Sequence, residues 1–197
     1  MATILIPGIK GSELTDSYPL DWPVRWSLED MMFGDAFENP LDFALLDGRY
    51  ERNDGHRMLP SRPIRFVYGE MVGKLRAWHP NEPLHVFTYD WRRPIEHAAR
   101  KLVEFCDELA GRERALGRKG GLNFVTHSMG GLVLRSALSL RGAGDPFDGI
   151  GRVVFIAPPF RGTIAAVQML EQAGATIFGT AGSDEKTAVL SERGVHH

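Results

Sequence analysis

One serine, Ser128, stands in a sequence context typical of a catalytic nucleophile. It lies within residues 123–131 (NFVTHSMGG), between a β-branched, apolar segment and a pair of glycines. In a nucleophile elbow a strand turns sharply into a helix with the serine at the apex, and small neighbours let the two segments cross closely. Thr126 replaces the first glycine of the usual G-x-S-x-G pattern, although threonine suits a strand. The pattern predicts a reactive serine, with an ordinary serine in a strand-to-helix turn as the alternative.

The segments that flank Ser128 have the patterns of the strand and helix that must hold it. Residues 121–125 are typical of a short buried strand, and apolar residues recur at helical spacing over 132–138. His127 adjoins the serine, but neighbouring residues at a sharp turn point in different directions. We therefore expect His127 to pack against or support the site and not to act as its base.

A glycine-containing loop near the N-terminus is expected to provide backbone donors. Residues 2–6 (ATILI) predict a strand that stops at Pro7 and Gly8. In serine hydrolases with an elbow, one oxyanion donor is the amide after the nucleophile, and the other comes from the loop after an early strand. Met129 and Ile9 fit these two roles. A plain turn that uses glycine for its positive φ is the alternative.

Four motifs in order are similar to those of the lecithin:cholesterol acyltransferase family: IPGIKGSEL (6–14), YDWR (89–92), HSMGG (127–131) and APPFRGT (157–163). The resemblance covers about residues 3 to 170. It implies an α/β-hydrolase fold and a Ser-Asp-His triad that hydrolyses or transfers acyl groups of lipid esters through an acyl-enzyme. By this resemblance Ser128 is the nucleophile and Ile9 and Met129 are the oxyanion donors.

The acid and the base of a triad should follow Ser128 in this fold. The histidines there are His196 and His197, and the most suggestive acid is Asp184. Asp184 lies too close to His196 for the helix and strand that normally intervene. The favoured interpretation is that the chain is the N-terminal part of a longer hydrolase, or that acid and base come from outside it. The alternative is a non-catalytic or truncated hydrolase-like module that binds an acyl ligand or a partner chain.

Alternating strand and helix patterns predict the architecture. Strands are expected near residues 2–6, 84–89, 122–126 and 152–157, and helices over 66–78 and 95–110, with a solvated loop at 111–121. The expected fold class is α/β, a hydrolase-like three-layer sandwich in one domain (1–197) with a mostly parallel sheet, incomplete at the C-terminus. Asp90 and Arg92 follow a strand and are expected to brace loops beside the site.

The segment 12–65 is too long and irregular for a simple connection, and 173–197 is a tail of uncertain role. The aromatic and methionine side chains of 12–65 suggest either a satellite core or a cap that shelters acyl chains or contacts a membrane surface. A sheet that ends after its fourth strand would leave an open edge, which predicts self-association.

Composition narrows the function classes. A formal net charge of −2 gives no general attraction to nucleic acid, and the single cysteine, Cys106, excludes an internal disulfide. The sequence has no metal-type Cys/His cluster and no phosphate-binding loop, so no cofactor or metal is expected. The first strand begins within two residues of Met1 and no apolar run is long enough to cross a bilayer, so we expect a cytoplasmic protein.

Overall fold

The structure, a computed structural model, describes residues 1–16, 24–26, 58–118, 121–141, 147 and 149–162. All its helices and strands belong to one compact unit, Met1–Pro158. Four strands form a parallel sheet in the order β5-β1-β6-β7. Their bounds are Ala2–Ile6 (β1), Leu84–Val86 (β5), Leu122–His127 (β6) and Ile150–Ile156 (β7). The four predicted parallel strands are therefore confirmed, in a general α/β fold.

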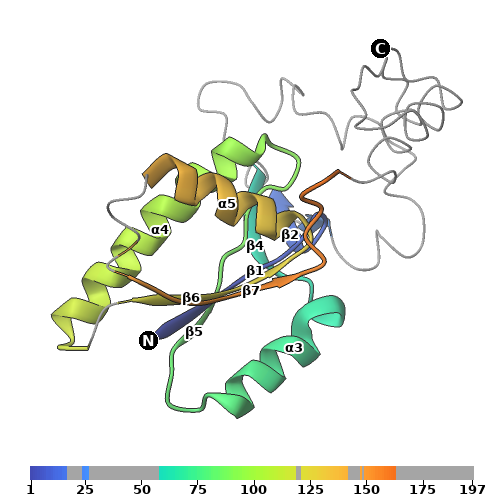
Figure 1. Cartoon of the computed structure of the whole chain (residues 1–197). Coiled ribbons are helices and arrows are strands. Elements are labelled where there is room, and N and C mark those ends of the chain that lie inside the picture. Colours follow the sequence, from blue (N-terminus) through green and yellow to red (C-terminus); the bar gives the residue numbers. More distant parts are fainter. Residues whose placement is uncertain (17–23, 27–57, 119–120, 142–146, 148, 163–197) are drawn as a thin grey trace, which may run out of the picture. The chain divides into compact units, whose positions relative to one another are not determined.

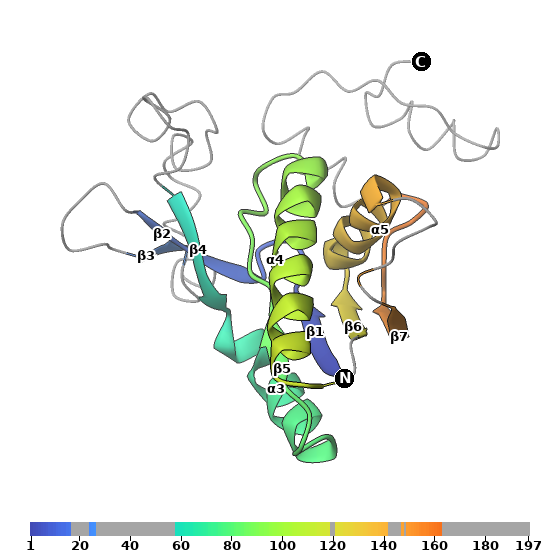
Figure 2. The same ribbon diagram turned by 90° about the vertical axis from the view of Figure 1, so that its left-hand side faces the viewer.

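Helices cover both faces of this sheet (Figures 1 and 2). Helix α3 (Arg65–Trp78) lies on one face, whereas α4 (Ile95–Ala115) and α5 (Met129–Arg141) pack against each other on the other face. The helices predicted over 66–78 and 95–110 are confirmed, but α4 continues to Ala115. The expectation of a loop from residue 111 is wrong because Glu113 is buried on α4 and binds the Arg118 guanidinium at 3.0 Å.

The core follows from the alternation of side chains along β1. Ile4 and Ile6 join the large cluster under α4 and α5, and Leu5 points to the smaller cluster under α3, which contains Tyr68 and Val125. Helix α4 contributes a stripe at intervals of three and four residues, made of Ala98, Ala99, Leu102, Cys106, Leu109, Ala110 and Glu113. The strand β1 is thus buried on both faces, as expected at the centre of a parallel sheet.

The segment 12–65 contributes a second sheet that the sequence patterns did not predict. Its strands are β2 (Ser12–Asp16), β3 (Val24–Trp26) and β4 (Met58–Pro63), antiparallel in the order β3-β2-β4. Of the aromatic and methionine residues in this segment, Trp26 of β3 and Met58 of β4 belong to the described residues, whereas the others and the tail 173–197 lie outside them.

Strand β7 forms one edge of the parallel sheet within the described part of the chain. Its side chains Val154, Phe155 and Ile156 are 48%, 41% and 36% exposed, so the edge is apolar on both faces. An exposed apolar edge strand can pair with another segment. Among the described residues no further strand pairs with β7, and self-association through this edge stays a prediction.

The reactivity of the Cys106 thiol is a test of how tightly α4 packs against the sheet. The side chain is fully buried, and burial raises the pKa of the thiol to about 12. Because the thiolate is the reactive form, we expect the native protein to resist a disulfide reagent at pH 8 and to react only as it unfolds in guanidinium. Absorbance of the released thiol measures this, with fully unfolded protein as the control. Rapid modification of the native protein would contradict the packing of α4 on the sheet.

Candidate functional site

Ser128 occupies the sharp turn between β6 and α5. Its φ of 51° lies in the left-handed region, which a residue with a side chain rarely adopts. Two backbone hydrogen bonds hold it: the Ser128 N–H donates to the Ile156 carbonyl at 2.9 Å, and the Gly131 N–H donates to the Ser128 carbonyl at 3.0 Å. The strand, strained serine and helix predicted for residues 121–138 therefore occur together at this position.

Glycines allow the close crossing at this turn. A Cβ on Gly8 would lie 2.8 Å from the Ser128 Cβ and 3.2 Å from His127 Nδ1, which places the loop after β1 directly against the serine. A Cβ on Gly130 would overlap the Ile6 carbonyl oxygen, and one on Gly131 would lie 2.9 Å from the Pro158 Cβ. Side chains at these positions would push the helix away from the ends of β1 and β7.

The substitution of Thr126 for the first elbow glycine is accommodated inside the sheet. The Thr126 side chain is fully buried, and its hydroxyl donates to the Val154 carbonyl of β7 at 3.4 Å. A buried hydroxyl with an acceptor avoids most of the cost of desolvation. Threonine at this position therefore joins β6 to β7 without blocking the turn.

Strained residues gather at the carboxyl ends of three neighbouring strands. Lys10 follows β1, Ser128 follows β6 and Ala157 follows β7, with φ values of 54°, 51° and 47°. Strain of this kind costs of order 1–3 kcal/mol per residue and clusters at functional sites. From β1 the chain crosses to β5 on one side, whereas from β6 it crosses to β7 on the other, so the site lies where the strand order reverses. Open α/β sheets bind ligands at such a point.

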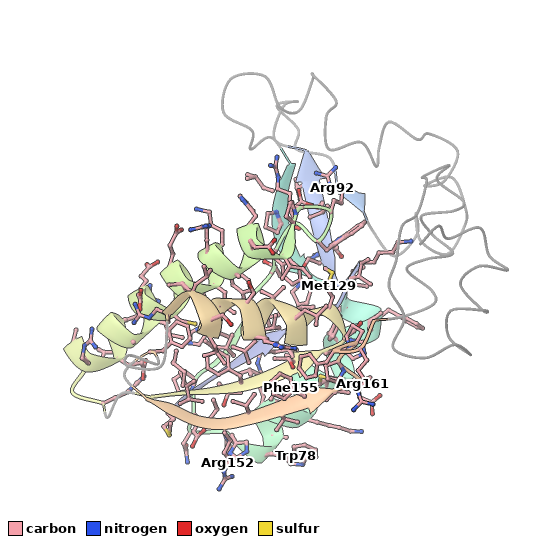
Figure 3. All side chains as sticks on the ribbon, turned by 45° about the horizontal axis from the view of Figure 1, so that its top comes forward. Trp78, Arg92, Met129, Arg152, Phe155 and Arg161 are labelled. Atoms are coloured by element: carbon pink, nitrogen blue, oxygen red, sulfur yellow. The ribbon has the colours of Figure 1, made fainter. Side chains whose placement is uncertain are left out.

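The two predicted oxyanion donors are next in the chain to residues that meet at the elbow: Met129 follows Ser128, and Ile9 follows Gly8. Met129 is the first residue of α5, and Figure 3 shows its side chain at the start of that helix. The backbone N–H groups of a first helical turn have no partner within the helix. Ile9 follows Gly8 in the loop after β1 and is 46% exposed. Among the described residues, the structure shows no backbone hydrogen bond donated by the N–H of Ile9 or Met129. The oxyanion role of these two amides stays a prediction.

Tyr68 of α3 is a site residue that the sequence did not reveal. Its hydroxyl oxygen accepts the Gly8 N–H at 2.8 Å and lies 2.8 Å from His127 Nδ1, and the two rings meet edge to face. The tyrosine side chain is 2% exposed, and burial raises its pKa. Nothing in the helical pattern of residues 66–78 distinguishes this tyrosine, because its partners come from distant segments.

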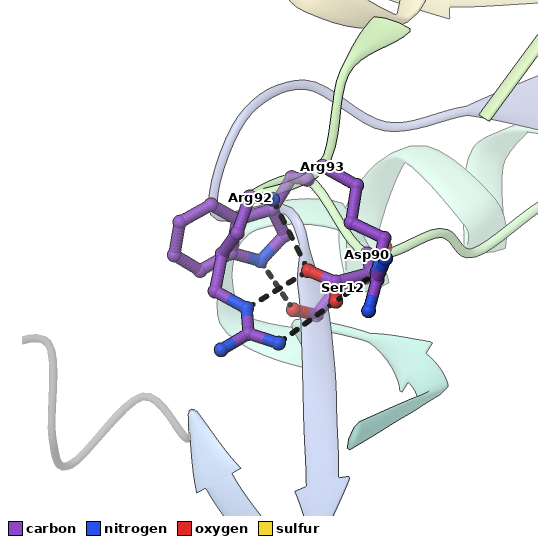
Figure 4. Close-up of polar contacts among 5 residues, drawn as sticks. Ser12, Asp90, Arg92 and Arg93 are labelled. Atoms are coloured by element: carbon purple, nitrogen blue, oxygen red, sulfur yellow. Dashed lines mark hydrogen bonds and ion pairs between the residues drawn. The ribbon is translucent and has the colours of Figure 1, made fainter. Parts of the chain in front are cut away.

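Asp90 and Arg92 form a buried ion pair within the loop that follows β5 (Figure 4). The Asp90 carboxylate accepts two bonds from the Arg92 guanidinium, at 2.9 and 2.8 Å, and one from the Arg92 backbone N–H at 3.1 Å. Arg93 lies 3.8 Å from the same carboxylate. The neighbouring Trp91 indole donates to the Ser12 carbonyl at 3.1 Å, which ties this loop to the start of β2.

An apolar groove of about 960 Å³ runs between α3 and the exposed face of β6 and β7. Met71, Leu75 and Trp78 line one wall, and Val154 and Ile156 line the floor. Trp78 and Arg152, which line the groove, lie well away from Met129 in Figure 3, and neither Ser128 nor Met129 is among the lining residues. Ile156 links the groove to the elbow, because its side chain lines the groove and its carbonyl accepts the Ser128 N–H.

The candidate acid and base of a triad, Asp184, His196 and His197, lie outside the described residues. Within the described ranges no histidine is hydrogen-bonded to the Ser128 hydroxyl, and no group of three His, Cys, Asp or Glu side chains has the arrangement of a metal site. In the same ranges no helix is both long and apolar enough to cross a membrane.

Comparisons with known proteins give a distant relative and a distant structural neighbour. No family model matches the chain. A Saccharomyces cerevisiae protein described as uncharacterized protein YJR098C is 25% identical over 142 residues, which are 68% of this chain and 20% of the yeast protein. The chain thus spans about one fifth of the length of that relative.

The structural neighbour comes from the crystal structure of the Tle4–Tli4 complex. It superposes with a TM-score of 0.56 and 17% sequence identity, over 86% of this chain and 48% of that chain. At this identity the likeness concerns the fold alone.

Replacement of Gly8 by alanine is expected to loosen the crossing at the elbow. The added methyl group would overlap Ser128, so Gly8→Ala should lower the free energy of unfolding by about 1–3 kcal/mol, the usual cost of overpacking. The matched control is Gly73→Ala on α3, where nothing lies within 4 Å, and this variant should gain up to about 1 kcal/mol. Urea unfolding followed by circular dichroism measures both. Equal effects of the two substitutions would contradict the close approach of Gly8 to Ser128.

The buried ion pair of Asp90 should contribute strongly to folding. Asp90→Asn removes a carboxylate that is 7% exposed from its pair with the Arg92 guanidinium, and the loss of one partner of a buried ion pair typically costs about 3–5 kcal/mol. Glu70→Gln breaks a comparable pair with Lys74 on the exposed surface of α3, and it should change stability little. Denaturant midpoints of the two variants test this difference. A small loss in Asp90→Asn would mean that the pair does not brace the loop.

Proposed function

We propose that the chain contains an α/β-hydrolase fold and acts as a serine-dependent acyl hydrolase or O-acyltransferase through Ser128. The observation that carries this proposal is the strained φ of Ser128 at a strand-to-helix turn, with Gly8 packed against its Cβ. The sheet order β5-β1-β6-β7 with helices on both faces supports the fold assignment.

The proposed reaction forms and breaks an ester on Ser128. A base removes the hydroxyl proton as Oγ attacks the acyl carbonyl carbon, and the backbone N–H groups of Ile9 and Met129 stabilise the resulting oxyanion. Collapse releases the alcohol, which takes the proton, and leaves the acyl group on Oγ. Water or a second alcohol then attacks the acyl-enzyme, and Ser128 is regenerated with its proton.

A lipid ester is the proposed substrate class. This step rests on the resemblance to the lecithin:cholesterol acyltransferase family. It is supported by the apolar groove, which offers space for an acyl chain and is lined in part by Ile156, the residue whose carbonyl accepts the Ser128 N–H. Contact of the segment 12–65 with a membrane surface belongs to the same proposal.

A second candidate function is that of a non-catalytic module that binds an acyl ligand or a partner chain. It is favoured by the lack of a histidine hydrogen-bonded to the Ser128 hydroxyl within the described ranges. The exposed apolar edge of β7 gives such a module a surface for pairing with a second copy or another protein. That the structural neighbour was solved as a complex is in keeping with partner binding.

Labelling with a fluorophosphonate probe distinguishes these two functions. We expect the probe to modify the wild-type chain and Ser139→Ala equally, and not to modify Ser128→Ala. Ser139 is the matched control because it lies on the same helix and its hydroxyl only bonds the Arg135 carbonyl. Failure to label wild-type protein whose circular dichroism shows a folded chain would reject an activated serine in this chain and favour the binding module.

A further inference from the structure

We infer that Tyr68 is a positioning residue of the Ser128 site, whose hydroxyl holds the loop after β1 in place and fixes the tautomer of His127. The inference rests on the function proposed for Ser128. It starts from one buried oxygen atom, the Tyr68 hydroxyl, which lies 2.8 Å from the Gly8 nitrogen and 2.8 Å from His127 Nδ1. These three groups belong to α3, the loop after β1 and the end of β6, so a single side chain joins three separate segments at the serine.

The direction of each hydrogen bond follows from the donors available. The Gly8 N–H can only donate, so the tyrosine oxygen is the acceptor of that bond. The hydroxyl hydrogen is then free for His127 Nδ1, the other group recorded within hydrogen-bonding distance of this oxygen. A hydroxyl that donates requires an acceptor, so Nδ1 carries no proton and the neutral ring carries its proton on Nε2. Burial favours the protonated hydroxyl that this arrangement requires.

This tautomer separates His127 from the chemistry of its neighbour. Nδ1 uses its lone pair to accept the Tyr68 hydroxyl, and Nε2 has no lone pair to offer because it holds the proton. Neither nitrogen can remove the proton of Ser128 while the bond to Tyr68 persists. The base must therefore come from another residue, and His127 instead connects the end of β6 to Tyr68.

The same hydroxyl selects which amide of the loop can stabilise an oxyanion. Because Tyr68 uses the Gly8 N–H, the next amide, that of Ile9, is the first one in the loop left for a ligand. Tyr68 also holds the Gly8 backbone in contact with Ser128, which fixes the distance between the loop and the nucleophile. A gain in mobility here should slow the acyl transfer step, since oxyanion donors act through their exact placement.

The test compares Tyr68→Phe with Tyr89→Phe. Each substitution removes one buried hydroxyl that binds the same loop, since Tyr89 donates to the Pro7 carbonyl at 2.9 Å. Phenylalanine keeps the volume of the ring, so both variants should fold. Nitrogen NMR of histidine-labelled protein reports the His127 tautomer, and amide hydrogen exchange reports the Gly8 N–H. Neither measurement depends on activity.

We expect wild type and Tyr89→Phe to show His127 protonated on Nε2 alone. Tyr68→Phe should show both tautomers, and its Gly8 amide should exchange at least tenfold faster than in Tyr89→Phe. An unchanged tautomer or unchanged Gly8 exchange in Tyr68→Phe would overturn the inference.

The rate of fluorophosphonate labelling tests the link to function. If wild-type protein is labelled, Tyr68→Phe should react at least about tenfold more slowly at a pH where the catalytic base is fully deprotonated. The midpoint of the plot of labelling rate against pH should stay unchanged. An equal rate would overturn the positioning role. If wild type is not labelled, the proposed function fails, whereas the assignment of the tautomer and of the Gly8 bond is still decided by the two NMR measurements.

Discussion

The close approach of the loop after β1 to the turn after β6 is the constraint on which the rest of the site depends. Gly8 packs against the Ser128 Cβ, and Gly130 packs against the end of β1, so no atom can be added on either side of this contact. The contact brings a strained serine, the loop that carries the Ile9 amide and the start of α5 into one small region. None of these features alone identifies a catalytic site, and their combination at the point where the strand order reverses is what supports the function proposed for Ser128.

Two tyrosines hold this contact from opposite faces of the sheet. Tyr89, in the core under α4 and α5, donates to the Pro7 carbonyl, and Tyr68, on α3, accepts the N–H of Gly8. These are the two polar groups of one peptide unit, and both would otherwise be buried without a partner. Burial raises the pKa of both phenols, which keeps each hydroxyl in the protonated form. The loop is therefore fixed by side chains and not by ladder hydrogen bonds, which leaves its next amide available.

Local patterns predicted the elements that carry the site better than the contacts between them. The four parallel strands and the helices have regular apolar spacing, so their positions were predictable, although α4 is longer because buried Glu113 pairs with Arg118. The elbow was predictable because Ser128 and its glycines are adjacent in sequence. The sheet of β2, β3 and β4 was not, since its strands are short and two prolines interrupt β4. Tyr68 was not predictable either, because its partners lie about sixty positions away.

The open edge of β7 bears on how the site is completed. The Ser128 N–H donates a hydrogen bond to the Ile156 carbonyl, and Ala157 follows the end of β7 at the same edge of the sheet. A further parallel strand on β7 would end at that same edge, so any acid or base that followed it would arrive beside the serine. Another chain that paired with β7 would reach the same place. The two proposed functions thus make opposite uses of one surface: a complete hydrolase covers β7 with segments that supply its base, whereas a binding module keeps β7 for a partner.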